Sequence, residues 1–188
     1  HIIYPKEYEN SAYLANQGDR CFHCKDALFN QMKHYMKQHT NTILAFGAIE
    51  DDKSDIRPGA LAAENHNAVA PLQEVNLFKS EIRQLSLHRG LPTAEKASFA
   101  CLGSRFPKGT PITLDKLSQV EKAEEILRTH GYKQYRVRHH NEICRIELEP
   151  NDFSKLINER ELIIKEIKKT GYRYVTLDLN GYSSGSTT

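Results

Sequence analysis

Tyr135-Arg136-Val137-Arg138-His139-His140-Asn141-Glu142-Ile143-Cys144-Arg145-Ile146-Glu147-Leu148 is the stretch that decides the fold of the second half of this chain. On either side of residues 139–142, apolar and charged residues alternate with the period of two that half-buried strands show. We therefore expect an antiparallel hairpin whose turn lies at residues 139–142 and includes both histidines. Cys144 falls on the apolar face and is expected in the core. The opposite face carries Arg136, Arg138, Arg145 and Glu147.

The segments around the hairpin complete a small α+β domain. Thr113 is a suitable N-cap for a helix that Gly131 ends. A second helix is expected near residues 159–170, and a last strand over residues 172–179. The expected order of elements is α-β-β-α-β.

The first half has a different pattern, in which short apolar runs alternate with helical segments. The runs at residues 42–47 and 68–72 are typical of strands buried on both faces of a parallel sheet. Helices are expected at residues 24–39, 58–65 and 76–88. Asn76 would cap the last of them, with Ile82 and Leu85 facing inward. The alternation predicts an α/β fold built on a parallel sheet.

The Pro/Gly/Thr-rich residues 107–111 separate the two patterns. They define an α/β domain at residues 1–108 and an α+β domain at residues 109–188. A chain of 188 residues is long enough for two small domains. The chain begins at His1, and we expect part of the α/β domain to lie upstream of it.

The composition is that of an ordinary globular protein, with 39% apolar and 27% charged residues. A formal net charge of only +2 argues against a nucleic-acid-binding surface. No apolar run reaches the roughly 20 residues that cross a bilayer. Four cysteines are too few for a disulfide scaffold at this length, so we expect cytoplasmic metal or redox chemistry.

Three of the cysteines could form one metal site. Cys21 and Cys24 form a C-x-x-C pair, and Cys101 lies in a loop rich in small residues. Three thiolates with one open position suit a [4Fe–4S] cluster whose fourth iron is free for substrate. Zinc would need a fourth ligand, for which His23, Cys144 or a water is a candidate. The alternative is two half-buried thiols at a helix start and an unrelated loop cysteine, and spacing alone favours neither interpretation.

Glu124 lies on the apolar stripe of the helix that follows Thr113, between Val120 and Leu127. A carboxylate that faces a protein interior needs a partner or a function. The alternative, which the pattern alone favours, is a stripe edge at which Glu124 reaches water or pairs with an arginine.

Arg136 and Arg138 alternate outward on one strand, where their guanidinium groups could fork onto a phosphate. Arg105, beside Ser104, would support this site if the two domains fold together there. The alternative is a solvated strand face on which Glu147 pairs with an arginine, which is the more frequent arrangement.

An acidic loop follows the first apolar run and contains Glu50, Asp51, Asp52 and Asp55. Acidic residues at the carboxyl end of a parallel strand are well placed to bind Mg²⁺ on a nucleotide. A solvated loop with helix-capping aspartates explains the same residues at least as well.

Taken together, five segments resemble the LarE family, the ATP-dependent sacrificial sulfur transferases. The segments are Gly18-Asp19-Arg20-Cys21-Phe22-His23-Cys24-Lys25, Asp51-Asp52-Lys53-Ser54-Asp55-Ile56-Arg57-Pro58-Gly59, Cys101-Leu102-Gly103-Ser104-Arg105-Phe106-Pro107-Lys108-Gly109-Thr110-Pro111-Ile112-Thr113, Arg136-Val137-Arg138-His139-His140 and Tyr172-Arg173-Tyr174-Val175-Thr176-Leu177-Asp178-Leu179-Asn180-Gly181-Tyr182. They follow one another in order over nearly the whole chain.

The resemblance implies a PP-loop ATP pyrophosphatase-type domain (Rossmann-like, HUP-type, of the adenine nucleotide alpha hydrolase superfamily) that is incomplete at its N-terminus. The α+β domain after it would bind substrate and mediate oligomerisation. The implied enzyme uses ATP and Mg²⁺ to convert a carboxylate of a pyridinium mononucleotide to a thiocarboxylate in nickel-pincer cofactor biosynthesis. The expected protein is a cytoplasmic homo-oligomer that binds neither membranes nor nucleic acid. The sequence does not identify its sulfur donor.

The site residues of the family fall on matching positions of this sequence. A cysteine that some members sacrifice falls on Ala100, whereas Cys21, Cys24 and Cys101 resemble the three ligands of the cluster-dependent members. The resemblance places Cys101, Ser104 and Arg105 in the catalytic loop, Arg136 and Arg138 on the substrate phosphate, and Glu124 and Glu147 among the acidic site residues. Nucleotide and Mg²⁺ binding is expected at Asp51, Asp52, Asp55 and Arg57.

Three departures from the family pattern leave other functions open. The phosphate-binding Ser-Gly-Gly-x-Asp-Ser loop has no counterpart in these residues, Phe46-Gly47-Ala48-Ile49 replaces Asp-Gly-Thr-Asn, and Ser183 replaces an arginine. One alternative is another PP-loop enzyme that thiolates tRNA or forms an amide. The other is a non-catalytic binding or assembly module.

Overall fold

A computed structural model of the chain describes residues 1–39, 41–54, 58–96 and 100–183. The chain forms two compact units, His1–Ser98 and Phe99–Thr188. The division lies ahead of the Cys101 loop, whereas the sequence boundary at 108/109 lies after it. Cys101, Ser104 and Arg105 therefore belong to the second unit. In the described part of the chain, no helix is long and apolar enough to cross a membrane.

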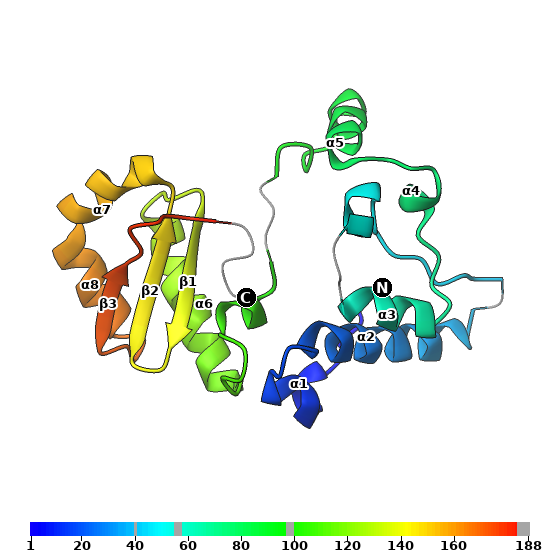
Figure 1. Cartoon of the computed structure of the whole chain (residues 1–188), viewed down its shortest axis with the longest axis horizontal. Coiled ribbons are helices and arrows are strands. Elements are labelled where there is room, and N and C mark those ends of the chain that lie inside the picture. Colours follow the sequence, from blue (N-terminus) through cyan, green and yellow to red (C-terminus); the bar gives the residue numbers. More distant parts are fainter. Residues whose placement is uncertain (40, 55–57, 97–99, 184–188) are drawn as a thin grey trace. The chain divides into compact units, whose positions relative to one another are not determined.

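The second unit is built on a three-stranded sheet (Figure 1). Its strands are β1 (Tyr135–His140), β2 (Ile143–Leu148) and β3 (Tyr174–Leu177), in the order β1-β2-β3. β1 and β2 pair antiparallel, as the alternating pattern predicts, and β3 joins β2 in parallel. The register places Arg136 opposite Glu147 and Arg138 opposite Arg145, so these four side chains share one face.

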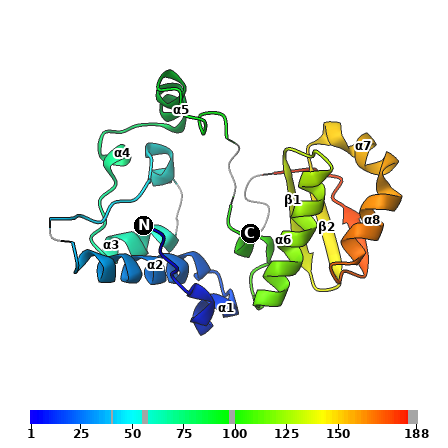
Figure 2. The ribbon, with the colours of Figure 1, turned by 180° about the vertical axis from the view of Figure 1, so that it is seen from behind.

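Helices cover the opposite face of this sheet, as the two views in Figures 1 and 2 show. They are α6 (Leu114–Thr129), α7 (Phe153–Asn158) and α8 (Arg160–Lys168). The unit also has two short 3₁₀ segments, η3 (Leu102–Arg105), which contacts α6 and β1, and η4 (Pro150–Asp152). Thr113 caps α6 by accepting a hydrogen bond from the backbone of Lys116 at 3.2 Å. Gly131 ends it with φ of 81°. The order α-β-β-α-β agrees with the prediction, the second helix being divided in two.

The core of the second unit lies between the sheet and these helices. Its buried side chains include Val120, Ala123, Leu127, Val137, Cys144, Ile146, Leu148, Ile163 and Ile167. Cys144 is fully buried, and this burial raises the pKa of its thiol. The prediction that Cys144 is a core residue is confirmed.

The two histidines of the hairpin are not in its turn, and that prediction is wrong. β1 continues through His140, and Asn141, with φ of 54°, makes the turn. The His139 ring is 1% exposed, and its Nδ1 lies 3.1 Å from the Tyr172 hydroxyl. Burial, together with the charges of Lys116 and His140, lowers the pKa of His139 to about 4. His139 is therefore neutral at physiological pH.

The first unit is mainly helical. Its elements are η1 (Glu7–Glu9), α1 (Ser11–Ala15), α2 (Arg20–Met36), η2 (Glu50–Ser54), α3 (Pro58–Asn65), α4 (Pro71–Glu74) and α5 (Lys79–His88). A small core of Phe29, Leu44, Ala62 and Ala63 joins α2 to α3. Helix α3 has its predicted bounds. Helix α2 begins at Arg20, ahead of the predicted residue 24, so both cysteines of the C-x-x-C pair lie within it.

The two strands predicted in the first unit are reduced to one parallel bridge, between Ala45 and Val69. Ile43 is 77% exposed, and Pro71 already begins α4. The prediction of two continuous buried strands is therefore wrong for the described part of this unit. An apolar run becomes a strand only where a neighbouring strand satisfies its backbone, and Val69 is the only bridge partner that the described residues give Ala45.

Helix α5 also differs from its prediction. Phe78, rather than Asn76, precedes its first turn, and the Phe78 amide donates to Glu81 Oε2 at 2.8 Å. Leu85, which was expected to face inward, is exposed. The Leu85 side chain therefore does not belong to the small core of the first unit.

Candidate functional site

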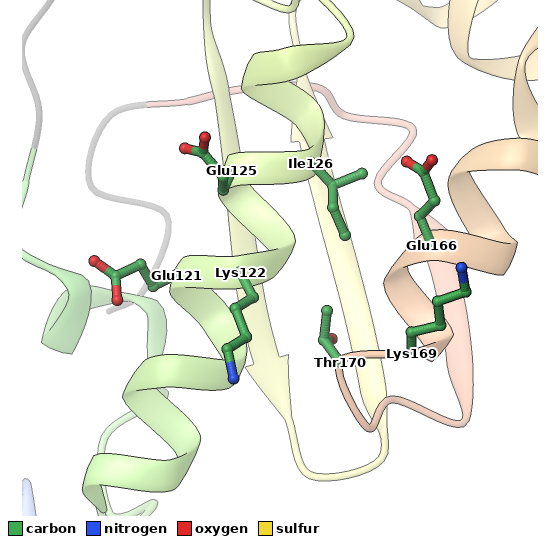
Figure 3. A pocket seen from close by; sticks show the side chains of 7 residues that line it. All are labelled: Glu121, Lys122, Glu125, Ile126, Glu166, Lys169 and Thr170. Atoms are coloured by element: carbon green, nitrogen blue, oxygen red, sulfur yellow. The ribbon is translucent and has the colours of Figure 1, made fainter.

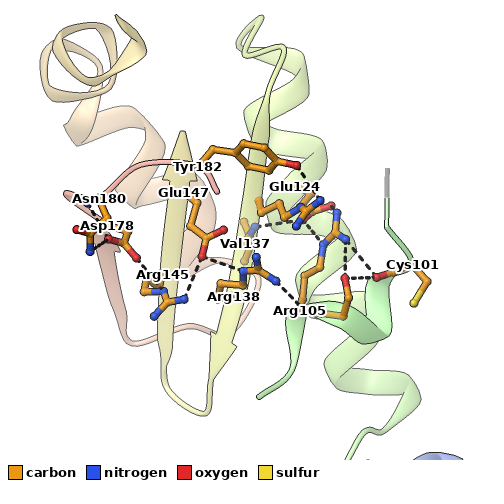
Figure 4. Close-up of polar contacts among 12 residues, drawn as sticks. Cys101, Arg105, Glu124, Val137, Arg138, Arg145, Glu147, Asp178, Asn180 and Tyr182 are labelled. Atoms are coloured by element: carbon orange, nitrogen blue, oxygen red, sulfur yellow. Dashed lines mark hydrogen bonds and ion pairs between the residues drawn. The ribbon is translucent and has the colours of Figure 1, made fainter. Parts of the chain in front are cut away.

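The polar face of the sheet, formed by Arg136, Arg138, Arg145 and Glu147, is the most highly charged buried region of the second unit that we identify (Figure 4). Glu147 is 0% exposed and Arg138 is 1% exposed. Glu147 Oε1 accepts from Arg138 Nε at 2.9 Å and from Arg145 Nη2 at 3.0 Å. Two arginines directly opposite each other would repel, and the shared carboxylate offsets that repulsion. The expected sharing of one face is confirmed, and so is the pairing of Glu147 with an arginine that the alternative predicted. The solvation that this alternative also predicted is wrong, because Arg138 and Glu147 are buried.

Glu124 does face the interior, and its partner is Arg105. Arg105 Nε and Nη2 donate to the two carboxylate oxygens at 2.7 and 3.0 Å, a bidentate pair (Figure 4). Glu124 Oε1 also accepts from the backbone of Val137 at 3.1 Å, which satisfies an amide at the free edge of β1. Burial, with the Glu124 charge, raises the pKa of the neighbouring Tyr135. Glu124 thus joins α6, β1 and η3.

The same arginine holds the Cys101 loop. Arg105 Nη1 donates to the carbonyls of Ala100 and Cys101 at 2.8 and 3.1 Å, and lies 3.0 Å from Ser104 Oγ. Ser104 Oγ in turn donates to the Cys101 carbonyl at 2.7 Å. The backbone of Cys101 is therefore fixed while its thiol stays exposed. All three nitrogens of Arg105 are engaged within the second unit.

Arg136 is held differently. It is 7% exposed, and its Nη2 donates to the Tyr182 hydroxyl at 2.8 Å. Its guanidinium carbon lies 4.7 Å from the centre of the Tyr182 ring. Among the described residues, it forms no ion pair with a carboxylate, in contrast to Arg105, Arg138 and Arg145.

Sequence reasoning did not single out Tyr182 or Asp178. Asp178 Oδ2 lies 3.5 Å from Arg145 Nε and extends the charged row to the segment after β3. Tyr182 reaches Arg136 from 46 positions along the chain. Arginines at every second position of a strand indicate that hydrogen-bonding or ion-pair partners lie on the same face. No spacing rule identifies partners that are so distant in sequence.

Cys21 and Cys24 lie in the first turns of α2, three positions apart and thus on one side of the helix. Cys21 is exposed, Cys24 is half-buried, and neither is in a disulfide bond. Arg20 Nη2 lies 3.8 Å from Cys21 Sγ, and His23 Nε2 lies 3.0 Å from Asp19 Oδ2. Within the described ranges, no three His, Cys, Asp or Glu side chains stand close enough to hold a metal ion. Cys101 is in the other unit, and the three-cysteine set stays a prediction.

The acidic loop forms capping contacts. Asp52 Oδ2 accepts from the Ile49 amide at 3.1 Å, and Asp51 Oδ2 accepts from the Lys79 amide at 2.8 Å, at the start of α5. These contacts match the helix-capping interpretation, and binding of Mg²⁺ or nucleotide stays a prediction. Asp55 and Arg57 lie outside the described residues.

A cavity of about 290 Å³ adjoins this loop. It is lined by Lys25, Phe46, Gly47, Ala48, Asp52, Ala60 and Gln73. A Cβ at Gly59 would lie 2.8 Å from Cδ of Lys25, so the glycine leaves room for this lysine side chain. The cavity combines one cation and one carboxylate with apolar walls.

A larger hollow of about 660 Å³ lies on the outer side of α6 and α8 (Figure 3). Its lining residues are Glu121, Lys122, Glu125, Ile126, Glu166, Lys169 and Thr170. None of the predicted site residues lines it. Its mixed charges on exposed helical surfaces give no reason to place the chemistry there.

Comparison with known proteins relates the whole chain to longer relatives. No family model matches it. It is 38% identical over 186 residues to the uncharacterized protein slr1717 of Synechocystis, covering 98% of this chain and 69% of that protein. It is 34% identical over 170 residues to the pyridinium-3,5-bisthiocarboxylic acid mononucleotide synthase of Lactiplantibacillus plantarum, covering 90% of this chain and 62% of that protein. It is 31% identical over 173 residues to the uncharacterized protein MJ0830 of Methanocaldococcus jannaschii, covering 91% and 67%.

The chain thus spans about two thirds of the length of these relatives. Each match covers at least 90% of this chain, so each extends over both units. On this evidence, the chain belongs to the LarE-like family.

Proposed function

We propose that this chain is part of an ATP-dependent sulfur transferase of nickel-pincer cofactor biosynthesis. Its substrate would be a pyridinium mononucleotide whose carboxylate becomes a thiocarboxylate. The observation that carries the proposal is the 34% identity, over 90% of the chain, to a protein named as a pyridinium-3,5-bisthiocarboxylic acid mononucleotide synthase. The protein is proposed to act as a homo-oligomer in the cytoplasm.

The first unit is proposed to form part of a PP-loop nucleotide-binding domain. Support comes from the parallel bridge between Ala45 and Val69 and from the cavity beside it, where Lys25 offers a positive charge and Asp52 a carboxylate. Mg²⁺ with ATP is a chemically suitable occupant, because carboxylate oxygens bind Mg²⁺ and a lysine binds phosphate. Asp51, Asp55 and Arg57 are the further candidates for nucleotide binding.

The second unit is proposed to bind the mononucleotide. Its buried arginines offer hydrogen-bond donors for a phosphate. The pair of Arg105 with Glu124 provides a rigid frame for the Cys101 loop. Because the side chains of such a frame are already in position, they can orient a reacting carboxylate without rearranging during the reaction.

The reaction we propose has two balanced stages. A substrate carboxylate oxygen attacks the α-phosphorus of ATP, which forms an acyl-adenylate and releases pyrophosphate. A sulfide equivalent then attacks the acyl carbon, the C–O bond to AMP breaks, and AMP leaves with the thiocarboxylate as product. The chain's own residues bind and orient the two substrates.

A [4Fe–4S] cluster is proposed at Cys21, Cys24 and Cys101. The donor set fits such a group, since none of the three cysteines is in a disulfide bond and their side chains are exposed or half-exposed. Cys144, in contrast, is buried, which raises the pKa of its thiol and keeps it protonated. When bound, the cluster would relay sulfur to the activated carboxylate.

The activity is tested with the full-length protein, ATP, Mg²⁺, pyridinium-3,5-biscarboxylic acid mononucleotide and a sulfide source under anaerobic conditions. We expect AMP, pyrophosphate and a thiocarboxylate in equal amounts, measured by chromatography and mass spectrometry. A tRNA substrate in place of the mononucleotide tests the thiolase alternative. ATP hydrolysis that depends on tRNA, with no thiocarboxylate formed on the mononucleotide, would contradict the proposal.

The cluster is tested separately by iron and sulfide content. Protein purified without oxygen should contain roughly four irons per chain. Cys21→Ala should lose this iron, whereas the matched control Cys144→Ala should retain it. Equal iron in wild type and Cys21→Ala would exclude the proposed ligand set.

A further inference from the structure

Arg136 carries a buried charge that the described protein does not balance. It is 7% exposed, and among the described residues both contacts of its guanidinium are with Tyr182. Burial of an isolated charge is costly unless a counter-ion or several hydrogen bonds compensate. A guanidinium has five N–H donors, and Tyr182 accepts from one nitrogen. The remaining donors suit an oxyanion.

Arg138 is in the opposite situation, although it lies two positions away on the same face of β1. Its Nε donates to Glu147 and its Nη1 donates to the Ser104 carbonyl at 2.8 Å. Its side chain is 1% exposed. The charge of Arg138 is thus already balanced inside the protein, and a ligand would have to displace these contacts to reach it.

Tyr182 is itself held in place by the segment that follows β3. Its amide donates to the Leu148 carbonyl at 2.8 Å, and the Gly181 amide donates to the Asp178 carbonyl at 3.0 Å. Gly181 has φ of 75°, and a Cβ at this position would lie 3.0 Å from the Leu148 oxygen. Any other residue at 181 would be strained and crowded. The position of Tyr182 is therefore built into the backbone.

We propose that Tyr182 is a positioning residue that orients Arg136 to bind the phosphate of a mononucleotide, and that Arg136, not Arg138, makes this contact. The tyrosine fixes one edge of the guanidinium by a hydrogen bond and supports it by the ring. This leaves the other donors in a fixed fork, the geometry that suits bidentate binding of a phosphate. The identity of the nucleotide in this inference rests on the proposed function. The presence of an anion site at Arg136 does not depend on it.

The experiment is a double-mutant cycle in the full-length protein, with binding measured by calorimetry. The probes are inorganic phosphate and nicotinic acid mononucleotide, and nicotinic acid riboside is the comparison without phosphate. Tyr182→Phe keeps the ring and removes the hydrogen bond, and should weaken binding of the mononucleotide about three- to tenfold. In the Arg136→Gln background, the same change should have no further effect.

Tyr174→Phe is the matched control, because Tyr174 also contacts an arginine, Arg173, but on the exposed side of β3. It should leave binding unchanged. Gly181→Ala should weaken binding without removing the tyrosine, since it displaces the segment that holds Tyr182. A purely structural role for Tyr182 would lower the melting temperature but leave the affinity of the folded protein unchanged.

Three results would overturn the inference. Tyr182→Phe could weaken binding equally in both backgrounds, the riboside could bind as tightly as the mononucleotide, or wild type could bind neither phosphate nor mononucleotide. Binding of phosphate with the predicted coupling, but not of the mononucleotide, would support the inference and count against the proposed function.

Discussion

The polar face of the sheet holds its arginines in two ways, although they lie on neighbouring strands and share one side. In the ion-paired part, Arg138 and Arg145 share Glu147. At the other corner, Arg136 contacts Tyr182. An arginine whose charge is balanced by a buried carboxylate stabilises the fold, whereas one without such a partner among the described residues is suited to an anion. Two arginines that look equivalent in sequence therefore have different partners in the structure.

The largest effect is expected in the ion-paired part. Glu147→Gln removes the carboxylate that two arginines share and leaves Arg138 buried without its counter-charge. We expect a loss of about 3–5 kcal/mol in the free energy of unfolding, measured by urea denaturation. Glu149→Gln, at an exposed position just beyond the same strand, is the control and should change stability little. Equal stability of the two variants would remove the distinction between the two parts of the face.

The second prediction is that the free energy of unfolding depends on pH through His139 in β1. The pKa of His139 is about 4 in the folded state and about 6.5 when unfolded, because burial disfavours its charged form. The unfolded chain therefore takes up the proton first, and the stability contributed by neutral His139 is lost as the pH falls from 6.5 towards 4. At about 1.4 kcal/mol per pKa unit, the loss approaches about 3 kcal/mol.

Thermal unfolding of wild type and His139→Gln between pH 7 and pH 4 measures this effect. The variant should lose less stability than wild type over the same interval. Identical slopes in the two proteins would show that another group is responsible.

A smaller effect is expected at the margin of the ion-paired part. Arg145 is 31% exposed, and its removal leaves Glu147 paired with Arg138. Arg145→Gln should therefore cost only about 1 kcal/mol of stability. This loss should shrink at high salt, as is typical of partly exposed ion pairs. A loss as large as that of Glu147→Gln would mean that Arg145, not Arg138, is the main partner.

Local patterns predicted the second unit well. The alternation in the hairpin, the N-cap at Thr113 and the glycine at 131 each depend on a few adjacent residues, and the structure has the corresponding strands and helix. Helical spacing placed Glu124 on the apolar stripe but favoured a stripe edge. The structure buries Glu124 and pairs it with an arginine, Arg105, as that alternative allowed. The two histidines were wrongly assigned to the turn because polar residues are frequent in turns. The residue that makes the turn is Asn141, which has a positive φ.

Other features depend on distant residues, which a local pattern does not contain. The runs at residues 42–47 and 68–72 have the composition of buried strands, yet strand formation depends on which neighbours satisfy the backbone. Arg105 meets Glu124 across 19 positions, and Tyr182 meets Arg136 across 46. The sequence identified most charged residues of the candidate site and allowed Glu147 to pair with an arginine. It identified neither the particular partners nor Asp178.

The most direct test of the central claim compares Arg136→Gln with Arg138→Gln in the full-length protein, each measured for stability and for binding of nicotinic acid mononucleotide. Arg138→Gln should lose about 3 kcal/mol or more of unfolding free energy, because it removes the fully buried ion-pair partner of the buried Glu147. Arg136→Gln should lose less than about 1 kcal/mol, yet lose most of the binding. If Arg136→Gln retains binding, or destabilises the protein as much as Arg138→Gln does, the division of the polar face into a structural part and a binding corner is contradicted.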